Sequence, residues 1–218
     1  MNALPTPRPA LGRPKDPAKR AAILSAAKQL FAEHGMDGVS MDQIAQAAGV
    51  SKLTVYSHFG DKDGLLGAVV RAHCEQEMPL QLFEPLPDTP LRERLLDIAR
   101  AFYDMISCPQ AIAGHRMLCA PNGTTPSLAQ HFWEAGPARI QAGLSALLQR
   151  RVEAGELVIE DVDVAAGHFF ALLKGEPHAR LMIGHPELLD DAAIERHLDS
   201  VVDFFLRAHR PDAARAAS

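Results

Sequence analysis

Hydrogen-bond donors cluster on one short stretch of the chain, between residues 52 and 58. Val55 and Phe59 lie four residues apart, so a helix here would turn both side chains inward. Its outer face then carries mostly donors, with no acidic residue among them: Lys52, Thr54, Tyr56, Ser57 and His58. Such side chains can position a protein on the phosphates of a nucleic acid and can reach the edges of its bases.

Two short helices and a tight turn are predicted to present these donors. Ser40 and Gln43 have the spacing of a capping box, which predicts a helix beginning at Met41. Gly49 can take the positive φ that ends this helix, and Ser51 is a suitable N-cap for the next one. A compact helix pair joined at a glycine is the helix-turn-helix arrangement.

The segment from Ala18 to Val70 resembles the DNA-binding domain of the TetR family of transcriptional regulators. The resemblance is carried by SKLTVYSHFGDKDGLL, preceded by an amphipathic helix that ends in LFAEHG. Residues of the family's pattern recur at Phe31, Gly35, Ile44, Ala45, Gly49, Val50, Tyr56, Phe59 and Lys62. The alternative, a plain helical hairpin in a bundle, would not need so many donors on one short helix.

The resemblance also implies which residues contact DNA. Tyr56, His58 and Lys62 match family positions that touch phosphate, while Thr54 and Lys52 match positions nearer the base edges. Two helix-capping serines complete the expected set, Ser40 and Ser51. Leu53 departs from the small residue often found at its position, and it could instead contact a thymine methyl group.

Charge is divided unevenly along the 218 residues. Residues 1–60 hold seven Lys and Arg against four Asp and Glu, a net +3; the remainder holds 15 against 23, a net −8, and the two sum to −5. A basic N-terminal module on an acidic body suits a protein that touches DNA with one end. Residues 1–14 contain four prolines and are expected to form a disordered basic arm, which is either a solvated tail or an arm that reaches phosphate or a minor groove.

Cysteine content and hydropathy indicate a cytoplasmic protein without a membrane segment. The cysteines are three, an odd number, and have no CxxC spacing, so free thiols in a reducing compartment are the simplest interpretation. No apolar run approaches the ~18 residues of a membrane helix. The N-terminus lacks the continuous apolar core of a secretory signal.

The remaining chain is predicted to be all-α, with about nine helices in total and no alternating strand pattern. We expect the disordered arm at 1–14, the helix-turn-helix domain at 15–60, a linking helix at 61–78 capped by Asp61, and a Pro-rich linker at 79–90 that no helix survives. A larger helical domain at 91–209 should follow, its first helix capped by Thr89 with Pro90 at the first helical position.

Proline and glycine predict the interruptions of this larger domain. Pro109 should end its first helix, and residues 121–126 should form a loop. The pair Gly136-Pro137 should interrupt or kink the helix at 127–154, and Gly175 with Pro177 should distort the one at 161–183. The last helix is predicted to begin at His185-Pro186.

In the family, the body helices enclose a small-molecule pocket, and aromatic, sulfur-containing and histidine side chains are typical of its lining. The candidates here are Phe102, Tyr103, Met105, His115, Met117, Phe132, Trp133, His168 and Phe169. Ordinary core packing is the competing interpretation for each of them. The resemblance also implies a homodimer formed by the last two long helices, with Phe170, Ile194, Leu198, Val201, Val202 and Phe205 at the interface. Here the competing interpretation is burial of both apolar faces inside one chain.

No catalytic pattern accompanies these features, and we expect neither enzymatic activity nor a cofactor. GxSxG, Gly-rich phosphate loops, GxGxxG after a strand and HExxH are all missing from the sequence. His115 and Cys119 are four apart and could share a helix face, but two ligands do not make a metal site. A redox role for Cys74, Cys108 or Cys119 would need a basic, exposed environment.

Two classes of function are therefore compared. The resemblance implies a DNA-binding regulator, a repressor released from a palindromic double-stranded operator by a small hydrophobic or aromatic effector. The alternative is an all-α small-molecule-binding protein or enzyme whose helix-turn-helix no longer binds DNA. The intact set of donors at Thr54, Tyr56, His58 and Lys62 favours the regulator.

Overall fold

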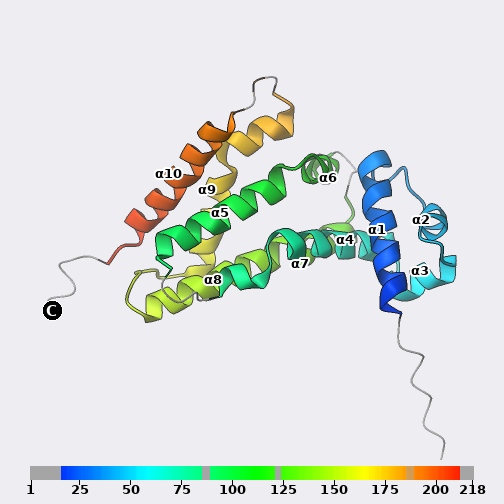
Figure 1. Ribbon diagram of the computed structural model, residues 1–218, viewed down its shortest axis with the longest axis horizontal. Helices are drawn as coiled ribbons and strands as arrows, with labels where there is room; N and C mark the ends of the chain where they lie inside the picture. The colour runs from blue at the N-terminus through cyan, green and yellow to red at the C-terminus, as the bar shows by residue number, and fades with distance from the viewer. Residues whose placement is uncertain (1–15, 85–88, 121–123, 186, 188, 212–218) are drawn as a thin grey trace, which may run out of the picture.

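A small helical head and a larger helical body make up an elongated molecule (Figure 1). The computed structural model describes residues 16–84, 89–120, 124–185, 187 and 189–211, so the predicted arm at 1–14 lies outside it. The described residues form ten α-helices and one 3₁₀ helix: α1 (Pro17–His34), α2 (Met41–Ala47), α3 (Lys52–Phe59), α4 (Lys62–Glu77), η1 (Leu80–Phe83), α5 (Leu91–Ser107), α6 (Pro109–Cys119), α7 (Pro126–Ala135), α8 (Pro137–Glu153), α9 (Val162–Ile183) and α10 (Asp191–Ala208). We call α1–α3 the head and η1 with α5–α10 the body.

The prediction of an all-helical fold with an N-terminal helix-turn-helix is confirmed. The described part of the chain has one α-helix more than the nine expected, because α7 and α8 are separate helices divided at Gly136. The other interruption also lies where the sequence placed it, since Gly175 inside α9 has a φ of 43° and a ψ of −152°.

The head is a three-helix unit with its own core. Asp16 caps α1 by accepting from the N–H of Ala18, and Pro17 occupies the first helical position. Ile23 of α1, Ile44 of α2 and Val55 of α3 are all fully buried and meet in one apolar cluster. Leu65 of α4 completes this cluster, so the first turns of α4 belong to the head core.

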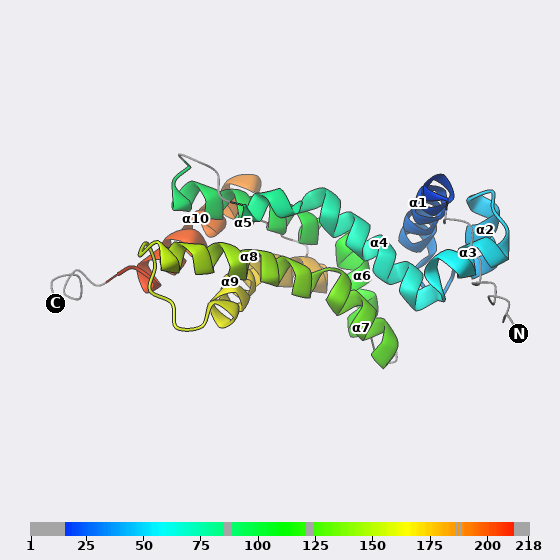
Figure 2. The same ribbon diagram turned by 90° about the horizontal axis from the view of Figure 1, so that it is seen from below.

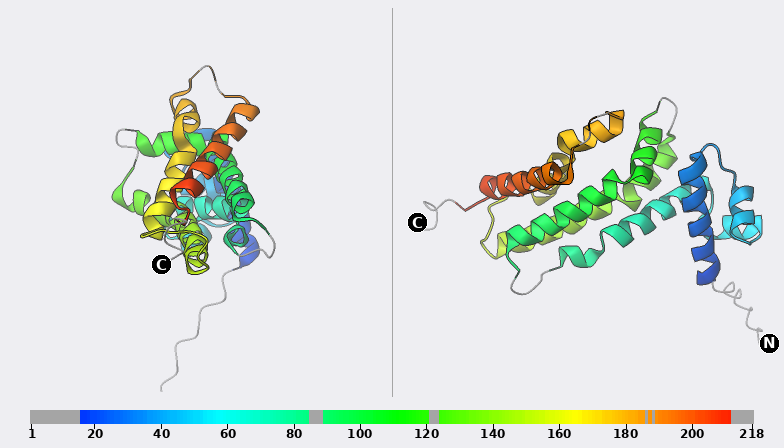
Figure 3. Two further views of the ribbon diagram at one scale, coloured as in Figure 1. Left: turned by 90° about the vertical axis from the view of Figure 1, so that its left-hand side faces the viewer. Right: turned by 45° about the horizontal axis from the view of Figure 1, so that its top comes forward.

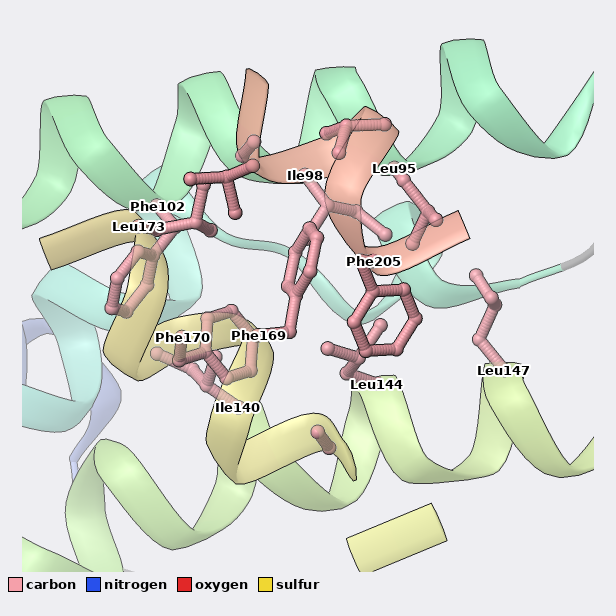
Figure 4. Close-up of a cluster of buried hydrophobic side chains, with 14 of the residues drawn as sticks. Leu95, Ile98, Phe102, Ile140, Leu144, Leu147, Phe169, Phe170, Leu173 and Phe205 are labelled. Carbon is pink, nitrogen blue, oxygen red and sulfur yellow. The ribbon is translucent and has the colours of Figure 1, made fainter. Parts of the chain in front are cut away.

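The body core lies between α5, α8, α9 and α10 (Figure 4). Ile98 of α5, Leu144 of α8, Phe169 of α9 and Phe205 of α10 are almost completely buried there. The rings of Phe169 and Phe205 meet edge to face, with centroids 5.1 Å apart. These helices form the packed end of the body farthest from the head (Figure 3).

Part of the predicted Pro-rich linker at 79–90 packs against the body. Residues 80–83 form the single 3₁₀ turn η1, and Phe83 is buried in the body core. The buried guanidinium of Arg94 donates to the carbonyl oxygens of Gln81 and, at 3.0 Å, of Glu84. Arg150 of α8 donates to the carbonyl of Phe83. The prolines prevent an α-helix, but two arginines satisfy the carbonyls that this leaves unpaired.

Two predicted helix starts are shifted. Pro90, which has an extended ψ of 141°, precedes α5 as its cap, and Thr89 supplies no capping hydrogen bond, so the helix begins at Leu91. The last helix begins at Asp191 and not at His185, because Asp190 accepts from the N–H of Ala193 as its N-cap. Pro186 lies outside the described residues.

The residues predicted at the dimer interface are mostly core residues, which corrects that prediction. Leu198, Val201, Val202 and Phe205 are buried within a single chain, where α10 packs on α5 and α9. Ile194 packs against the same core. Apolar residues that repeat with helical periodicity show only that one face of the helix is buried. In α10 that face is buried by other helices of the same chain. The large apolar side chains that α9 and α10 leave exposed are Val164, Leu172 and, at its end, Ile183 of α9, and Phe204 of α10.

None of the helices in the described ranges of the chain combines the length and the apolar character that a membrane crossing requires.

The η1 contacts yield a stability prediction. Arg94→Met should lower the free energy of unfolding by about 2 kcal/mol or more, because two part-buried carbonyls lose their donor. Arg92→Met is the matched control, since its exposed ion pairs with Asp199 and Asp203 are worth about 0–1 kcal/mol. Urea unfolding measures both, and equal losses for the two variants would contradict this role of Arg94.

Candidate nucleic-acid interface and ligand cavity

The turn between α2 and α3 is built as its sequence predicts. Ser40 and Gln43 form a reciprocal capping box: the Gln43 N–H donates to Ser40 Oγ at 3.3 Å, and the Ser40 N–H donates to Gln43 Oε1 at 2.8 Å. Gly49 has a φ of 64°, which favours glycine at this position. Ser51 Oγ accepts from the N–H of Thr54 at 3.2 Å and thereby caps α3.

The predicted DNA contacts all lie at the surface of the head or at the start of α4. Ser40, Ser51, Lys52 and Tyr56 are exposed, while Thr54, His58 and Lys62 are half-buried. Val55 turns inward from the same helix, as its spacing predicts. Leu53 is 78% exposed, which is unusual for a leucine and leaves its side chain free to meet a partner.

Two features of this surface could not be deduced from the local sequence. The ammonium of Lys52 donates to Asp42 Oδ2 at 2.9 Å, and this hydrogen bond raises the pKa of Lys52. The guanidinium of Arg20, from α1, lies 5.4 Å from the centre of the Phe59 ring at the end of α3. The first contact occupies a candidate DNA-binding residue, and the second brings a cation of α1 beside the end of α3.

A large cavity lies where the head meets the body. Its volume is about 850 Å³, which is within the range of small-molecule sites. Residues of α1, α4, α5, α6, α7, α8 and α9 line it. The head contributes Phe31 and Met36, and α4 contributes Leu66, Val70 and His73. The cavity is therefore not enclosed by the body alone.

Six of the nine predicted ligand-binding residues line this cavity: Phe102, Met105, His115, Met117, Phe132 and Trp133. Trp133 is also 54% exposed, so it lies at a point where the cavity meets solvent.

The other three predicted lining residues lie elsewhere. Phe169 is fully buried against Phe205 in the body core. Its neighbour Phe170 lines the cavity and packs against Phe102, with tilted rings whose centroids are 4.5 Å apart. Adjacent helical residues point about 100° apart, so only one of the two phenylalanines can face the cavity. Tyr103 is buried in the body core, where burial raises the pKa of its phenol, and His168 is exposed on α9.

Sequence reasoning missed the lining residues that come from distant segments. Among the ionisable ones are Lys28 of α1, His73 and Glu77 of α4, Asp104 of α5 and Lys174 of α9. Their types are ordinary for exposed helix faces. Only the packing of the head on the body brings them around one cavity, so no local pattern in the sequence could have marked them.

Two half-buried histidines lie together beside the cavity. The rings of His115, from α6, and His178, from α9, meet edge to face with centroids 5.7 Å apart. Burial lowers the pKa of His178 to about 4, and the charges of His115 and Lys174 add to this effect. Burial and then the Lys174 charge also lower the pKa of His115. Both imidazoles are therefore neutral near pH 7.

Helix α7 packs closely on α4 (Figure 2). Gly67 makes this approach possible, since a Cβ added there would lie 3.2 Å from the Cβ of His131. A Cβ at Gly136 would lie 3.0 Å from the sulfur of Cys74. The hydroxyl of Thr125 also donates to Asp63 Oδ2 at 3.2 Å. Phe132 and Trp133 thus belong to a helix that rests directly on α4.

The described residues contain no group of three or more His, Cys, Asp or Glu side chains arranged to hold a metal ion, His115 and Cys119 included. Cys74, Cys108 and Cys119 are free thiols. Burial raises the pKa of Cys74 to about 11, so its reactive thiolate form is suppressed.

Comparison with known proteins identifies both parts of the chain. Residues 23–69 match a family model described as bacterial regulatory proteins of the tetR family, and residues 93–211 match one described as the C-terminal domain of AefR-like transcriptional repressors. The uncharacterized HTH-type transcriptional regulator YdeS of Bacillus subtilis (strain 168) is 29% identical over 192 residues, which cover 82% of this chain and 86% of YdeS.

Solved structures are similar over nearly their whole length. A putative TetR-family regulator from Mesorhizobium loti MAFF303099 aligns with a TM-score of 0.73 and 30% identity, covering 88% of this chain and 97% of that protein. The flavonoid-responsive regulator FrrA aligns with a TM-score of 0.71 and 35% identity, covering 89% and 98%.

The lowered histidine pKa values predict acid sensitivity. Folded His178 resists protonation down to about pH 4, whereas the unfolded side chain takes up a proton near pH 6.5. The unfolded state binds more protons in this window, so stability should fall as the pH falls from 6.5 towards 4. His178→Gln should flatten this decline in urea midpoints measured at several pH values. His168→Gln, at an exposed histidine, should leave the pH dependence of the urea midpoint unchanged. If both variants keep the wild-type pH dependence, His178 is not the source of the acid sensitivity.

Proposed function

Because the chain belongs to the TetR family of transcriptional regulators, we propose that it is a homodimeric repressor which a small aromatic ligand releases from a palindromic operator. The observation that carries the proposal is the shared lining of the cavity. Phe31 comes from the head, Leu66 from α4 and Phe132 from the body, so a ligand there touches every part that must move to change DNA binding.

DNA contacts are assigned to the exposed face of α3 and its surroundings. Tyr56, His58 and Lys62 would hold phosphates, and Thr54 and Lys52 would lie nearer base edges. Lys52 must exchange its ion pair with Asp42 for such a contact. Since that pair is exposed, the exchange costs about 0–1 kcal/mol. The capping serines, Ser40 and Ser51, would offer further donors at the two helix starts.

Two chains are expected to associate through the outer faces of α9 and α10. Phe204 is 54% exposed on α10, and Val164 and Leu172 are exposed on α9. Leu172 and Val164 are eight residues apart, so they lie along one face of the helix. A symmetric dimer places two recognition helices about 34–36 Å apart, or at a multiple of that distance, which suits a palindromic site.

An aromatic ligand agrees with the chemistry of the cavity. Phe102, Phe132 and Phe170 supply flat apolar surfaces, and the volume admits several fused or linked rings. FrrA, which is 35% identical, is described as flavonoid-responsive, and this supports a planar aromatic effector here. A ligand alters DNA affinity only if it binds the operator-bound and free conformations unequally.

The competing function, a small-molecule-binding protein that has lost DNA binding, is disfavoured by the intact head. Its capping box, its glycine turn and its exposed donors are all formed. An electrophoretic mobility shift with the promoter of the chain's own operon separates the two functions. We expect a retarded complex, and a failure to bind any promoter fragment would favour the alternative.

Lys62→Ala should weaken binding to all DNA sequences alike, because a phosphate contact carries no sequence information. The slope of log K against log salt concentration should fall by about 1. Arg151→Ala, in the last turn of α8 on the body, is the control and should leave the slope unchanged. An unaltered slope for Lys62→Ala would show that this residue does not contact phosphate.

Phe204→Asp should convert the dimer to a folded monomer, because it places a charge in the interface without disturbing the core. Val202→Asp should instead unfold the chain, since an unpaired charge would be buried completely. Sedimentation equilibrium and circular dichroism distinguish these results. A Phe204→Asp protein that remains dimeric would place the interface elsewhere.

Ligand release can be measured with the single tryptophan, Trp133. Naringenin, a flavonoid, should quench its fluorescence and lower operator affinity by a factor of about 5 to 150, the usual range of allosteric coupling. Trp133→Ala should reduce the loss of operator affinity that naringenin causes. The affinity of the unliganded variant for the operator should be unchanged. If aromatic compounds bind the cavity but operator affinity never changes, the chain is not ligand-controlled.

A further inference from the structure

Two basic side chains line the cavity where α6 and α9 border it. His115 of α6 and Lys174 of α9 line it, and His178 lies behind His115 with the ring centroids 5.7 Å apart. The His115 ring also meets the Phe132 ring edge to face, with centroids 5.7 Å apart. We call His115, Lys174 and His178 the basic corner.

The basic corner has unused hydrogen-bonding capacity. Nε2 of His178 is a buried atom with no hydrogen-bond partner among the described residues. A backbone hydrogen bond with Ala111 acts on His115 and partly offsets the lowering of its pKa. Buried polar atoms normally have a partner, so the unmatched nitrogen of His178 beside the cavity needs an explanation. A neutral imidazole offers one N–H donor and one acceptor nitrogen.

The basic corner also has uncompensated charge. Lys174 forms no ion pair with any described residue. The nearby histidines cannot neutralise it, and their own pKa values are lowered partly by its charge. An anionic group placed there would meet the Lys174 ammonium beside two half-buried imidazoles, and charge-assisted hydrogen bonds are stronger than neutral ones.

We propose that the basic corner binds a carboxylate carried by an aromatic ligand, whose rings lie against Phe102, Phe132 and Phe170. This inference rests on the proposed function, because it assumes that the cavity is a ligand site. It goes further by naming the ligand class, an aryl carboxylate, and by assigning the selectivity to Lys174.

The cavity also offers a competing polar region. Asp104 and Glu77 line it from α5 and α4. Burial, and then the charges of Glu195 and Glu77, raise the pKa of Asp104, which shows that these carboxylates repel one another. A cationic ligand would relieve that repulsion, so the experiment must compare both signs of ligand charge.

Three compounds with one scaffold test the proposal by isothermal titration of the full chain at pH 7.5. Biphenyl-4-carboxylate is an anion, biphenyl-4-carboxamide is its uncharged isostere, and 4-(aminomethyl)biphenyl is a cation. We expect the carboxylate to bind at least tenfold more tightly than the carboxamide, and the cation to bind most weakly. Equal affinities, tightest binding of the cation, or no binding of any of the three would overturn the proposal.

Two lysine variants locate the selectivity. Lys174→Met should reduce the preference for the carboxylate to less than about threefold while the carboxamide affinity stays within twofold. Lys28→Met, at the other lysine of the lining, should retain the tenfold preference. Lys174 is exposed, so its replacement should not disturb folding. A Lys174→Met protein that still prefers the carboxylate tenfold would refute the assignment.

Operator affinity measured in the same samples separates this inference from the proposed function. A carboxylate preference that depends on Lys174 but leaves operator binding unchanged would support the basic corner and contradict ligand-controlled repression. If the carboxamide and the carboxylate release the operator at equal concentrations, ligand-controlled repression is supported and the carboxylate preference of the basic corner is contradicted.

Discussion

One helix is part of two hydrophobic cores, and the rest of the molecule depends on that constraint. Leu65, near the start of α4, is fully buried in the head core, while Cys74 and Met78, at its end, are buried in the body core. Only about two and a half to three and a half helical turns separate these anchor points. The head therefore cannot rotate independently, because any change in its orientation must change how α4 lies on the body (Figure 1).

The two ends of α4 are held differently, and this makes a tilt the natural movement. Its C-terminal end is followed at once by η1, whose carbonyls are bound by Arg94 and Arg150. Its middle rests on α7 through a glycine contact, Gly67 against His131, and it borders the cavity. A ligand that displaces α7 or the middle of α4 would pivot the head about η1. Coupling of about 1–3 kcal/mol between the two sites would be sufficient for control of DNA binding.

The sequence predicted the parts of this arrangement that local chemistry determines. Ser40 with Gln43, Ser51 and Asp61 cap their helices as their positions suggest, because a cap depends on a few neighbouring atoms. The sequence alone does not show whether Phe169 or Phe170 faces the cavity. It also does not show whether the apolar face of α10 meets a partner or the chain's own core. Those outcomes depend on packing between distant helices, as do the binding of η1 carbonyls by Arg94 and the meeting of Lys174 with His115.

The central claim, that ligand control requires α4 to move on α7, can be tested by locking the two helices together. Gly67→Cys with His131→Cys, in a Cys119→Ser background, would bring two Cβ atoms to 3.2 Å, slightly less than the ~3.5–4.5 Å of a disulfide, so a small outward shift of α7 allows the bond to form. The measurement is operator affinity with and without naringenin, for the reduced and the oxidised protein. We expect naringenin to release the operator from the reduced protein and to have no effect on the oxidised one. Equal release from both forms would contradict a movement of α4 against α7.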